Sequence, residues 1–343
     1  MKMKRHVTCL MKKLTEKSHF STLQITRFLS TQEAIERRSY LFTLEKKRQI
    51  ENVGRIEKIE VQYKGIPKDC TLVMNKNIST PYDCARHLSE WHMESSVLAL
   101  LDGNLHWDMH RPLTESCTLE FQNYKAAEPQ QVNKAFWRTC SLMLGACATV
   151  AFKDTVPVHL HSFPLPDIRS GSFIYDVDLP TLSDWQPTHQ EVLTLAAEYV
   201  KLCRKAVPLE RLEVGEELAL EMFVDNEHKS KQIPNIAKTN GKVILYRAGN
   251  HVDISRGPLI SNTAQIGRLA VTAVHKLTGP TEDGVSQLYR FQGVALPKGV
   301  VLDHFAFSIL MDRAKKLNPA RSPFLKKEDP EINEQIENVA AQA

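Results

Sequence analysis

Two short segments of strand character, separated by one turn, constrain the fold of this chain more than any other feature. In the first, Ile59, Val61 and Tyr63 alternate with polar residues, which is the two-residue period of a half-buried strand. Gly65 follows and ends the segment. A second apolar stretch covers residues 70–74 and ends at a turn rich in asparagine. The pattern predicts two consecutive β-strands.

A helix is predicted directly after these strands. Residues 79–81 read Ser-Thr-Pro, which offers a hydroxyl cap and a proline in the first helical turn. Ala85, Leu88 and Trp91 continue one helical face. The spacing therefore predicts one helix that runs from the cap to Trp91.

Two further strands complete a small unit, which we assign to residues 56–126. Residues 97–101 are apolar and end at an Asp102-Gly103 turn, and Leu119 and Phe121 alternate with polar neighbours. The order strand, strand, helix, strand, strand is typical of a ubiquitin-like grasp, in which one helix lies across a mixed sheet.

Residues 127–320 are predicted to form a second domain, which begins at a Glu128-Pro129 linker. A loop punctuated by prolines covers residues 155–166. The remaining pattern mixes helices and strands, so the chain as a whole is expected to be α+β. Helices are predicted at 132–152, 191–207 and 303–317, and strands at 173–178, 243–246, 252–254, 268–274 and 288–296.

The first thirty residues have the composition of an organelle targeting segment. Up to residue 32 there are seven basic residues and one acid, Glu16, among many hydroxyl side chains. Basic, hydroxyl-rich and acid-poor sequence is typical of a mitochondrial transit peptide, and residues 27–29, Arg-Phe-Leu, resemble a processing site. A basic tail that binds an acidic partner is the alternative. We assign residues 1–30 to the transit peptide.

Two charged segments flank the predicted domains. Residues 31–55 are helical in character, with Leu41 and Leu44 as isolated apolar positions, and are expected to form an exposed arm. Residues 321–343 are polar and charged and are expected to be disordered.

The composition excludes several classes of protein. The chain has 343 residues, of which 42% are hydrophobic, and its net charge is only +4. Its longest apolar run, 142–152, is well short of the roughly 20 residues that span a bilayer, so no membrane span is expected. The seven cysteines form no Cys-x-x-Cys pair, which favours free thiols in a reducing compartment over disulfides or a zinc ribbon.

Four landmarks, in the right order, resemble the N-terminal half of threonyl-tRNA synthetase. The most specific of them reads Tyr-Arg-Ala-Gly-Asn-His-Val-Asp-Ile-Ser-Arg-Gly-Pro. The resemblance implies a small TGS domain of the ubiquitin-like β-grasp type, followed by an α+β domain similar to the synthetase editing domain. The first landmark combines 79–85 with 100–103 and 107–108, and the others are 173–177, 246–258 and 288–295.

The catalytic positions of that family are replaced here. The editing site of the family uses a His-x-x-x-His pair on a helix, then a Cys and a His from a facing strand and loop. In this sequence those positions hold Arg138, Leu142, Ser255 and Leu259. Leucine cannot move a proton, and arginine stays protonated and is a poor base. The resemblance therefore implies a chain that is not an enzyme and has no catalytic residues.

The organisation of the chain points to a binding scaffold. Too few residues follow position 317 to hold the aminoacylation domain of a synthetase. The layout resembles a protein of the mitochondrial large ribosomal subunit. This implies a structural role in mitochondrial translation in the matrix, with ribosomal proteins and rRNA as partners and no small-molecule substrate.

Two basic clusters are candidates for contact with rRNA phosphates, although solvated surface is the alternative. Fewer aromatic residues lie among them than single-strand stacking needs, so protein contacts are expected to matter at least as much. The candidates are Arg37, Arg38, Lys46, Lys47 and Arg48 in the arm, and Arg313, Lys315, Lys316 and Arg321 near the end of the chain.

Two other functions stay open at this point. The chain could be a free-standing hydrolase that removes wrong amino acids from tRNA, if His275 or Cys140 has replaced the lost groups. It could also be a free RNA-binding regulator. A metal or cofactor is not expected, because His106 and His110 have no third ligand nearby and the chain has no phosphate-binding glycine motif.

Overall fold

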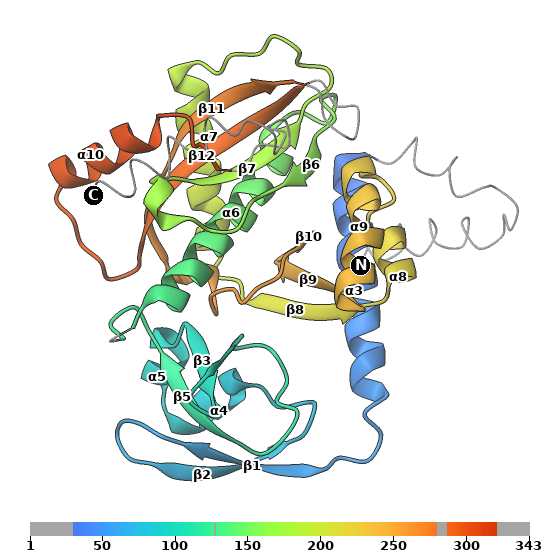
Figure 1. The fold of residues 1–343 in the computed structure, drawn as a ribbon, viewed down its shortest axis with the longest axis vertical. Helices are drawn as coiled ribbons and strands as arrows, with labels where there is room; N and C mark the ends of the chain where they lie inside the picture. The colour runs from blue at the N-terminus through green and yellow to red at the C-terminus, as the bar shows by residue number, and fades with distance from the viewer. Residues whose placement is uncertain (1–29, 127, 280–286, 321–343) are drawn as a thin grey trace, which may run out of the picture.

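The computed structural model describes residues 30–126, 128–279 and 287–320 of the chain. They form three β-sheets and a set of helices, so the predicted α+β class is confirmed (Figure 1). The predicted tail and all but the last residue of the predicted transit peptide lie outside the described residues. No helix in the described part of the chain is long and apolar enough to cross a membrane.

The N-terminal unit contains a five-stranded sheet. Its strands are β1 (Lys58–Tyr63), β2 (Cys70–Asn75), β3 (Leu98–Leu101), β4 (Leu105–Trp107) and β5 (Cys117–Gln122). They lie in the order β2-β1-β5-β3-β4, with β1 and β5 parallel and the other neighbours antiparallel. The four predicted strands are confirmed, and β4, which is only three residues long, was not predicted.

Two short helices, α4 (Pro81–Leu88) and α5 (Glu90–Ser95), replace the single helix predicted here. The predicted cap is confirmed, because Thr80 and Asp83 form a reciprocal capping box. Continuation to Trp91 on the same face is wrong. Ser89 has an extended backbone and caps α5 with its own hydroxyl, which leaves the Trp91 side chain 56% exposed.

The largest part of the body is a four-stranded antiparallel sheet in the order β11-β12-β7-β6. Helices α6 and α7 cover one face, and α10 covers part of the other (Figure 1). The elements are α6 (Gln130–Ala151), β6 (His159–Ser162), β7 (Phe173–Asp178), α7 (His189–Arg204), β11 (Ile266–Thr278), β12 (Gln287–Pro297) and α10 (His304–Ala314).

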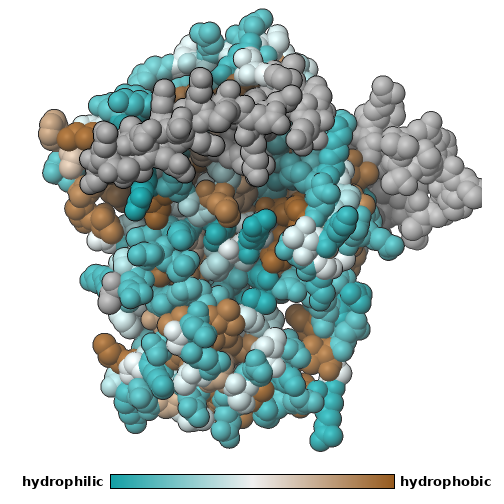
Figure 2. Space-filling view, in the orientation of Figure 1, coloured by the Kyte–Doolittle hydropathy of each residue, from teal (hydrophilic) through white to brown (hydrophobic). Residues whose placement is uncertain are grey.

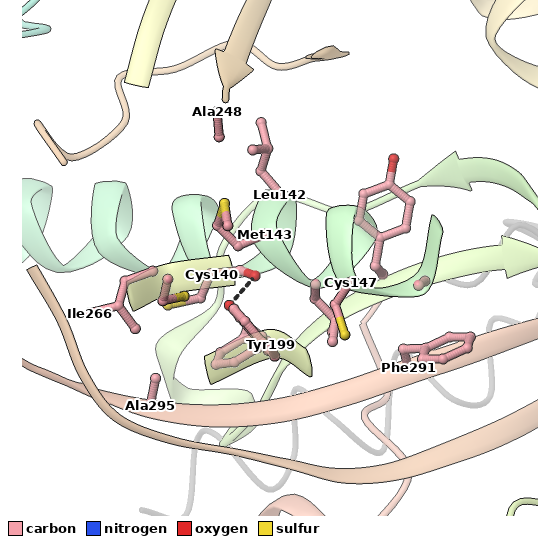
Figure 3. Close-up of a cluster of buried hydrophobic side chains, with 14 of the residues drawn as sticks. Cys140, Leu142, Met143, Cys147, Tyr199, Ala248, Ile266, Phe291 and Ala295 are labelled. Carbon is pink, nitrogen blue, oxygen red and sulfur yellow. Dashed lines mark hydrogen bonds between the residues drawn. The ribbon is translucent and has the colours of Figure 1, made fainter. Parts of the chain in front are cut away.

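The core between this sheet and α6 is tightly packed and contains cysteines (Figure 3). Cys140 and Cys147 are buried, and burial raises the pKa of both thiols. The hydroxyl of Tyr199 on α7 donates a 2.7 Å hydrogen bond to the Cys140 carbonyl oxygen. The predicted free thiols are confirmed for these two cysteines, which pack in the core as small apolar side chains.

A third sheet, in the order β10-β9-β8, has its own hydrophobic core. Three helices surround it. The elements are β8 (Leu209–Val214), α8 (Glu216–Met222), α9 (Glu227–Asn240), β9 (Val243–Ala248), β10 (His251–Ile254) and the N-terminal helix α3 (Thr31–Glu51). The single 3-10 turns Ile168–Ser170 and Thr263–Gln265 complete the described elements.

The N-terminal helix α3 packs on this third sheet and is not the exposed arm that was predicted. Its Phe42 side chain is fully buried in the core of the third sheet, and the Arg247 guanidinium lies 4.5 Å from the centre of the Phe42 ring. The prediction was wrong because only a few positions of this charged helix are buried, so its apolar periodicity is weak.

Candidate functional site

Helix α6 and the segment after β10 face each other, as the resemblance implied. The Arg138 Nη1 donates a 2.8 Å hydrogen bond to the carbonyl oxygen of Pro258. One residue further along α6, the Thr139 hydroxyl oxygen accepts a 3.1 Å hydrogen bond from the backbone N–H of Ile260. The positions that correspond to the family's editing site therefore meet in this fold.

The groups at those positions are unsuited to proton transfer. Leu142 and Leu259 are fully buried in the large apolar core. The Ser255 side chain is also buried, and its hydroxyl oxygen accepts a hydrogen bond from the Gly257 N–H. Burial lowers the pKa of Arg138, but an arginine in a protein remains protonated. None of these four side chains can take the part of a neutral imidazole or a thiolate in proton transfer.

Cys140 and His275, which were considered as substitutes, cannot supply the missing base or nucleophile at this site. Burial keeps Cys140 as a neutral thiol, since its pKa lies well above the ordinary value. The His275 ring lies on the α10 side of β11, where its Nε2 is 3.0 Å from the carbonyl oxygen of Lys315. That side of the sheet is opposite α6, so His275 lies away from the candidate site.

A carboxylate from the N-terminal unit closes the site. Asp108, just after β4, is buried and accepts hydrogen bonds from the Tyr246 hydroxyl at 2.9 Å and from the Leu259 N–H at 2.8 Å. The Arg211 Nε lies 3.6 Å away. Burial raises the pKa of Asp108, and these neighbours offset only part of the effect. Asp108 therefore connects the N-terminal unit to the loop that follows β10.

Gly257 allows this loop to approach Tyr246. Its φ is +65°, and a Cβ placed there would lie 1.8 Å from the Tyr246 hydroxyl oxygen. Only glycine combines that backbone conformation with so close a contact. Gly257 is thus required for packing in this chain, whether or not any chemistry takes place.

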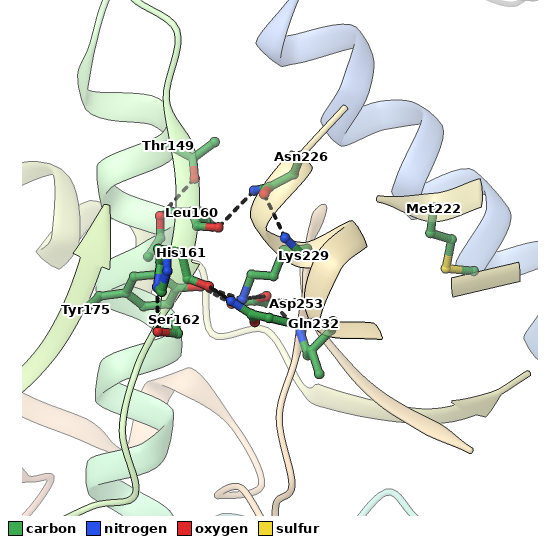
Figure 4. Close-up of polar contacts among 12 residues, drawn as sticks. Thr149, Leu160, His161, Ser162, Tyr175, Met222, Asn226, Lys229, Gln232 and Asp253 are labelled. Carbon is green, nitrogen blue, oxygen red and sulfur yellow. Dashed lines mark hydrogen bonds and ion pairs between the residues drawn. The ribbon is translucent and has the colours of Figure 1, made fainter. Parts of the chain in front are cut away.

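A second buried cluster is centred on Asp253, within the same stretch (Figure 4). The Lys229 Nζ on α9 is 2.7 Å from an Asp253 carboxylate oxygen and donates to the Tyr175 hydroxyl at 3.0 Å. The Tyr175 hydroxyl in turn donates to the other Asp253 oxygen. Burial alone would raise the pKa of Asp253, but Lys229 and His251 outweigh it and the pKa is lowered.

Neighbouring groups hold this cluster in place. The Asn226 side chain caps α9 by accepting from the Lys229 N–H, and donates to the carbonyl oxygen of Leu160 on β6. His251 is buried beside Asp253, and desolvation lowers its pKa to about 4. The cluster therefore links α9, β6, β7 and β10 through buried polar contacts.

Sequence reasoning missed this cluster. Asp253 lies two residues before Ser255, inside the most specific stretch of the resemblance, so the sequence contained a signal for it. The sequence contained no such signal for Lys229, because helix α9 was not predicted. Pro234 lies inside this helix and interrupts the helical pattern of the sequence. In the described ranges, no group of three or more His, Cys, Asp or Glu side chains is placed to hold a metal ion.

The basic candidates on α3 are mostly engaged inside the chain. Arg38 is buried and forms an ion pair with Asp225, and its Nε donates to the Met222 carbonyl oxygen. Lys47 is the most exposed of the five, with its side chain 72% accessible. The five pairs are Arg37 with Glu221, Arg38 with Asp225, Lys46 with Glu210, Lys47 with Glu51 and Arg48 with Glu45.

The candidates near α10 are more accessible. Lys315 forms an exposed ion pair with Asp312, and the Arg313 guanidinium donates to the Arg169 carbonyl oxygen. The Lys316 side chain is exposed. Arg321 lies outside the described residues. Contact between these groups and RNA stays a prediction.

Comparison with known proteins identifies the relatives of this chain. A search against models of protein families finds no match. The chain is 52% identical over 298 residues to the large ribosomal subunit protein mL39 of Drosophila melanogaster, which covers 86% of this chain and 88% of that protein.

More distant similarity extends to threonine–tRNA ligases. Identity is 28% over 225 residues to the probable cytoplasmic threonine–tRNA ligase 1 of Dictyostelium discoideum, and 28% over 222 residues to the human cytoplasmic ligase 1. The matches cover 65% and 64% of this chain but only 29% and 28% of the ligases. At 52% identity over most of both proteins, the chain belongs to the mL39 family of large ribosomal subunit proteins.

Proposed function

We propose that this chain is a structural, non-enzymatic component of the large subunit of the mitochondrial ribosome. The observation that carries the proposal is the 52% identity to a large ribosomal subunit protein over 86% of the chain. The basic, acid-poor sequence of residues 1–30 supports import into the mitochondrial matrix.

The absence of enzymatic activity rests on the candidate site. Two leucines, an arginine and a bonded serine occupy the positions that carry the editing chemistry of the related ligases. Asp108 also binds the backbone N–H of Leu259, so the loop is engaged by another part of the same chain. A protein can keep a fold after losing its reaction, and the fold then offers surfaces for docking.

At a finer level, the N-terminal unit is a TGS-type β-grasp and the rest is a degenerate editing-like domain. The sheet order β2-β1-β5-β3-β4, with β1 and β5 parallel and helix α4 packed against the core, supports the β-grasp. The boundaries that fit best are 56–126 for the first domain and 127–320 for the second. The N-terminal helix α3 then packs on the second domain, on its third sheet.

Docking in the ribosome is proposed to use protein contacts and rRNA contacts together. Among the candidate cations, Lys47, Arg48, Lys315 and Lys316 have exposed side chains and are suited to phosphate contact. Arg38, being buried in an ion pair, would act on the fold instead. Any rRNA contribution would weaken as salt is raised.

A sucrose gradient of mitochondrial lysate at moderate salt tests this function. The chain is expected to sediment with the large subunit, and to stay there when the salt is raised to a level that releases proteins bound only by charge. Migration at the top of the gradient would instead favour the free RNA-binding regulator.

A deacylation assay tests the enzymatic alternative. The purified chain is incubated with threonine tRNA that carries serine, alongside an active editing domain from a threonine–tRNA ligase as the positive control. No hydrolysis above the rate without protein is expected. Turnover by this chain would contradict the structural role and would point to a recruited group.

A further inference from the structure

The outer face of α10 is apolar and uncovered by the described residues. Val301, Phe305 and Ile309 are 89%, 75% and 53% exposed, and Leu317 follows at 51%. Figure 2 shows hydrophobic side chains gathered at the edge of the molecule where Figure 1 draws α10. Side chains at positions i and i+4 of a helix lie on one face, so Phe305 and Ile309 are neighbours.

The other face of α10 already packs on the sheet. Phe307 and Ala314 are buried against Ala270 and Val294, and the Arg268 guanidinium lies 4.0 Å from the centre of the Phe307 ring. A helix that is apolar on both sides is normally covered on both sides. The outer face therefore lacks a covering segment among the described residues.

Exposed lysines flank α10 in the sequence on both sides. Lys298, Lys315 and Lys316 are exposed, and only Lys315 has an acid partner in the described part of the chain, namely Asp312. An apolar centre with a positive rim fits a segment that offers aliphatic side chains and carboxylates. RNA would satisfy the rim but would leave the aliphatic centre without a match.

The chain itself contains such a segment. Residues 328–343 carry five acids and no lysine or arginine. Ile332, Ile336 and Val339 lie at helical spacing, so one face of a helix would be aliphatic. Asp329 and Pro330 directly before them are typical of a helix start. Segments of such polar composition in general fold only when they bind a surface.

We propose that residues 328–343 dock on the outer face of α10, with the aliphatic side chains against Phe305 and Ile309 and the acids near Lys315 and Lys316. The inference stands apart from the proposed ribosomal function.

The connection is long enough for this. Ala320 is held on the sheet, because its carbonyl oxygen accepts a 2.8 Å hydrogen bond from Arg290 on β12. From that fixed point, residues 321–327 can span up to about 25 Å when extended, which exceeds the roughly 16 Å length of α10.

Tethering also lowers the affinity that docking requires. A short flexible connection gives an effective concentration of about 1 mM for the attached segment. A segment that binds α10 with a Kd near that value would therefore cover it for about half of the time. Modest apolar contact and a few opposite charges are sufficient.

Amide hydrogen exchange across α10 in the purified chain tests the proposal. Protection of the α10 amides is expected to fall severalfold when the chain ends at Ala320. It should fall in the same way in full-length I332S/I336S/V339S. The matched control N333S/Q335S/N338S changes the same number of side chains off the aliphatic face and should keep the protection.

A second measurement uses a synthetic peptide of residues 328–343. Added at millimolar concentration to the chain that ends at Ala320, it should restore protection of α10, and K315E/K316E should weaken that effect. Equal exchange of α10 in the full-length and shortened chains would overturn the proposal. So would protection that arises only in the assembled ribosomal subunit, since another macromolecule would then cover this face.

Discussion

Two buried carboxylates contact the segment 246–259, Asp253 from within it and Asp108 from the N-terminal unit, and they are stabilised in opposite ways. Asp253 contacts the Lys229 ammonium at 2.7 Å, and its pKa is lowered. Asp108 accepts from neutral donors, while Arg211 is 3.6 Å away and lies closer to Glu213, at 2.7 Å. Its pKa is raised by burial.

The difference follows from what each carboxylate connects. Asp253 links elements of the second domain, and a lysine on α9 supplies the counter-charge. Asp108 joins the N-terminal unit to the loop that closes the candidate site, where hydroxyl and amide donors fix its position. Charge thus stabilises one cluster, and directed neutral hydrogen bonds stabilise the other.

The two clusters also predict opposite responses to pH. A carboxylate with a lowered pKa contributes stability above its ordinary pKa that is lost as the pH falls through the lowered value, which applies to Asp253. A carboxylate with a raised pKa instead lowers the stability of the folded chain as the pH rises. For Asp108, stability falls as the pH rises from the ordinary value of 3.8 through the raised one.

The largest effect is expected from Lys229→Met. Removing the ammonium leaves the Asp253 charge buried without its partner, which costs about 3–5 kcal/mol of unfolding free energy. Urea denaturation at neutral pH measures it. Lys238→Met, an exposed change on the same helix, is the control and should cost little. The double variant K229M/D253L should recover part of the loss, and no recovery would contradict the ion-pair explanation.

The second prediction concerns His251, which lies beside Asp253 and makes the stability of that cluster depend on pH. The pKa of this buried imidazole is lowered from 6.5 to about 4, mainly by desolvation, with Asp253 opposing and Arg38 and Lys229 reinforcing the shift. The unfolded chain takes up a proton at higher pH than the native chain does. Stability should therefore fall as the pH drops from 6.5 towards 4, with His251 contributing a loss of about 3 kcal/mol.

Stability curves of the wild type and of His251→Gln over this pH range check the effect. The variant should show a shallower decline than the wild type. His304→Gln removes an exposed histidine and should leave the slope as it is in the wild type. Parallel curves for all three proteins would mean that His251 titrates normally in the folded chain.

Gly257→Ala is expected to disrupt the Asp108 cluster by moving Tyr246, one of the hydrogen-bond donors to Asp108. The new methyl group would overlap the Tyr246 hydroxyl and displace it from Asp108. Gly249→Ala is the matched control, because Gly249 also has a positive φ but its nearest neighbour is 4.0 Å away. The excess cost at position 257 should be about 2 kcal/mol by thermal or urea unfolding. Equal costs would mean that the loop relaxes.

The smallest effect is expected from Asp108→Asn. The amide keeps the shape and one acceptor oxygen while it removes a charge that burial disfavours, so the cost at neutral pH should be about 1 kcal/mol. Asp253→Asn should cost more, because it leaves Lys229 without its counter-charge. If the two asparagine variants were equally destabilised, the contrast between the clusters would be wrong.

Sequence patterns predicted the strands of the N-terminal unit and most of the large sheet, where alternation and turns are regular. They failed where tertiary contacts override local pattern. Helix α9 contains Pro234, β4 has three residues, and α3 buries Phe42 with few other apolar positions. β6, with only four residues, lies inside the segment that was predicted as a loop, and β8 was also missed.

For the candidate site, the resemblance located the four replaced positions, and the structure brings α6 and the loop together. It could not indicate Asp108, which reaches the site from the N-terminal unit, 151 residues before its partner Leu259. Lys229 was also beyond prediction. Contacts between residues so distant in the chain depend on how whole domains pack, and local periodicity contains no information about that.

The Arg290 side chain determines where the folded body can be shortened. Its guanidinium joins the Asp176 carboxylate on β7 to the carbonyl oxygens of Asn318 and Ala320. A chain that ends at Ala320 keeps all of these hydrogen bonds. A chain that ends directly after α10 would lack the carbonyl oxygens of Asn318 and Ala320, so two hydrogen bonds of the buried Arg290 guanidinium would be lost. The shortest chain that keeps the Arg290 contacts therefore ends at Ala320, six residues beyond the end of α10.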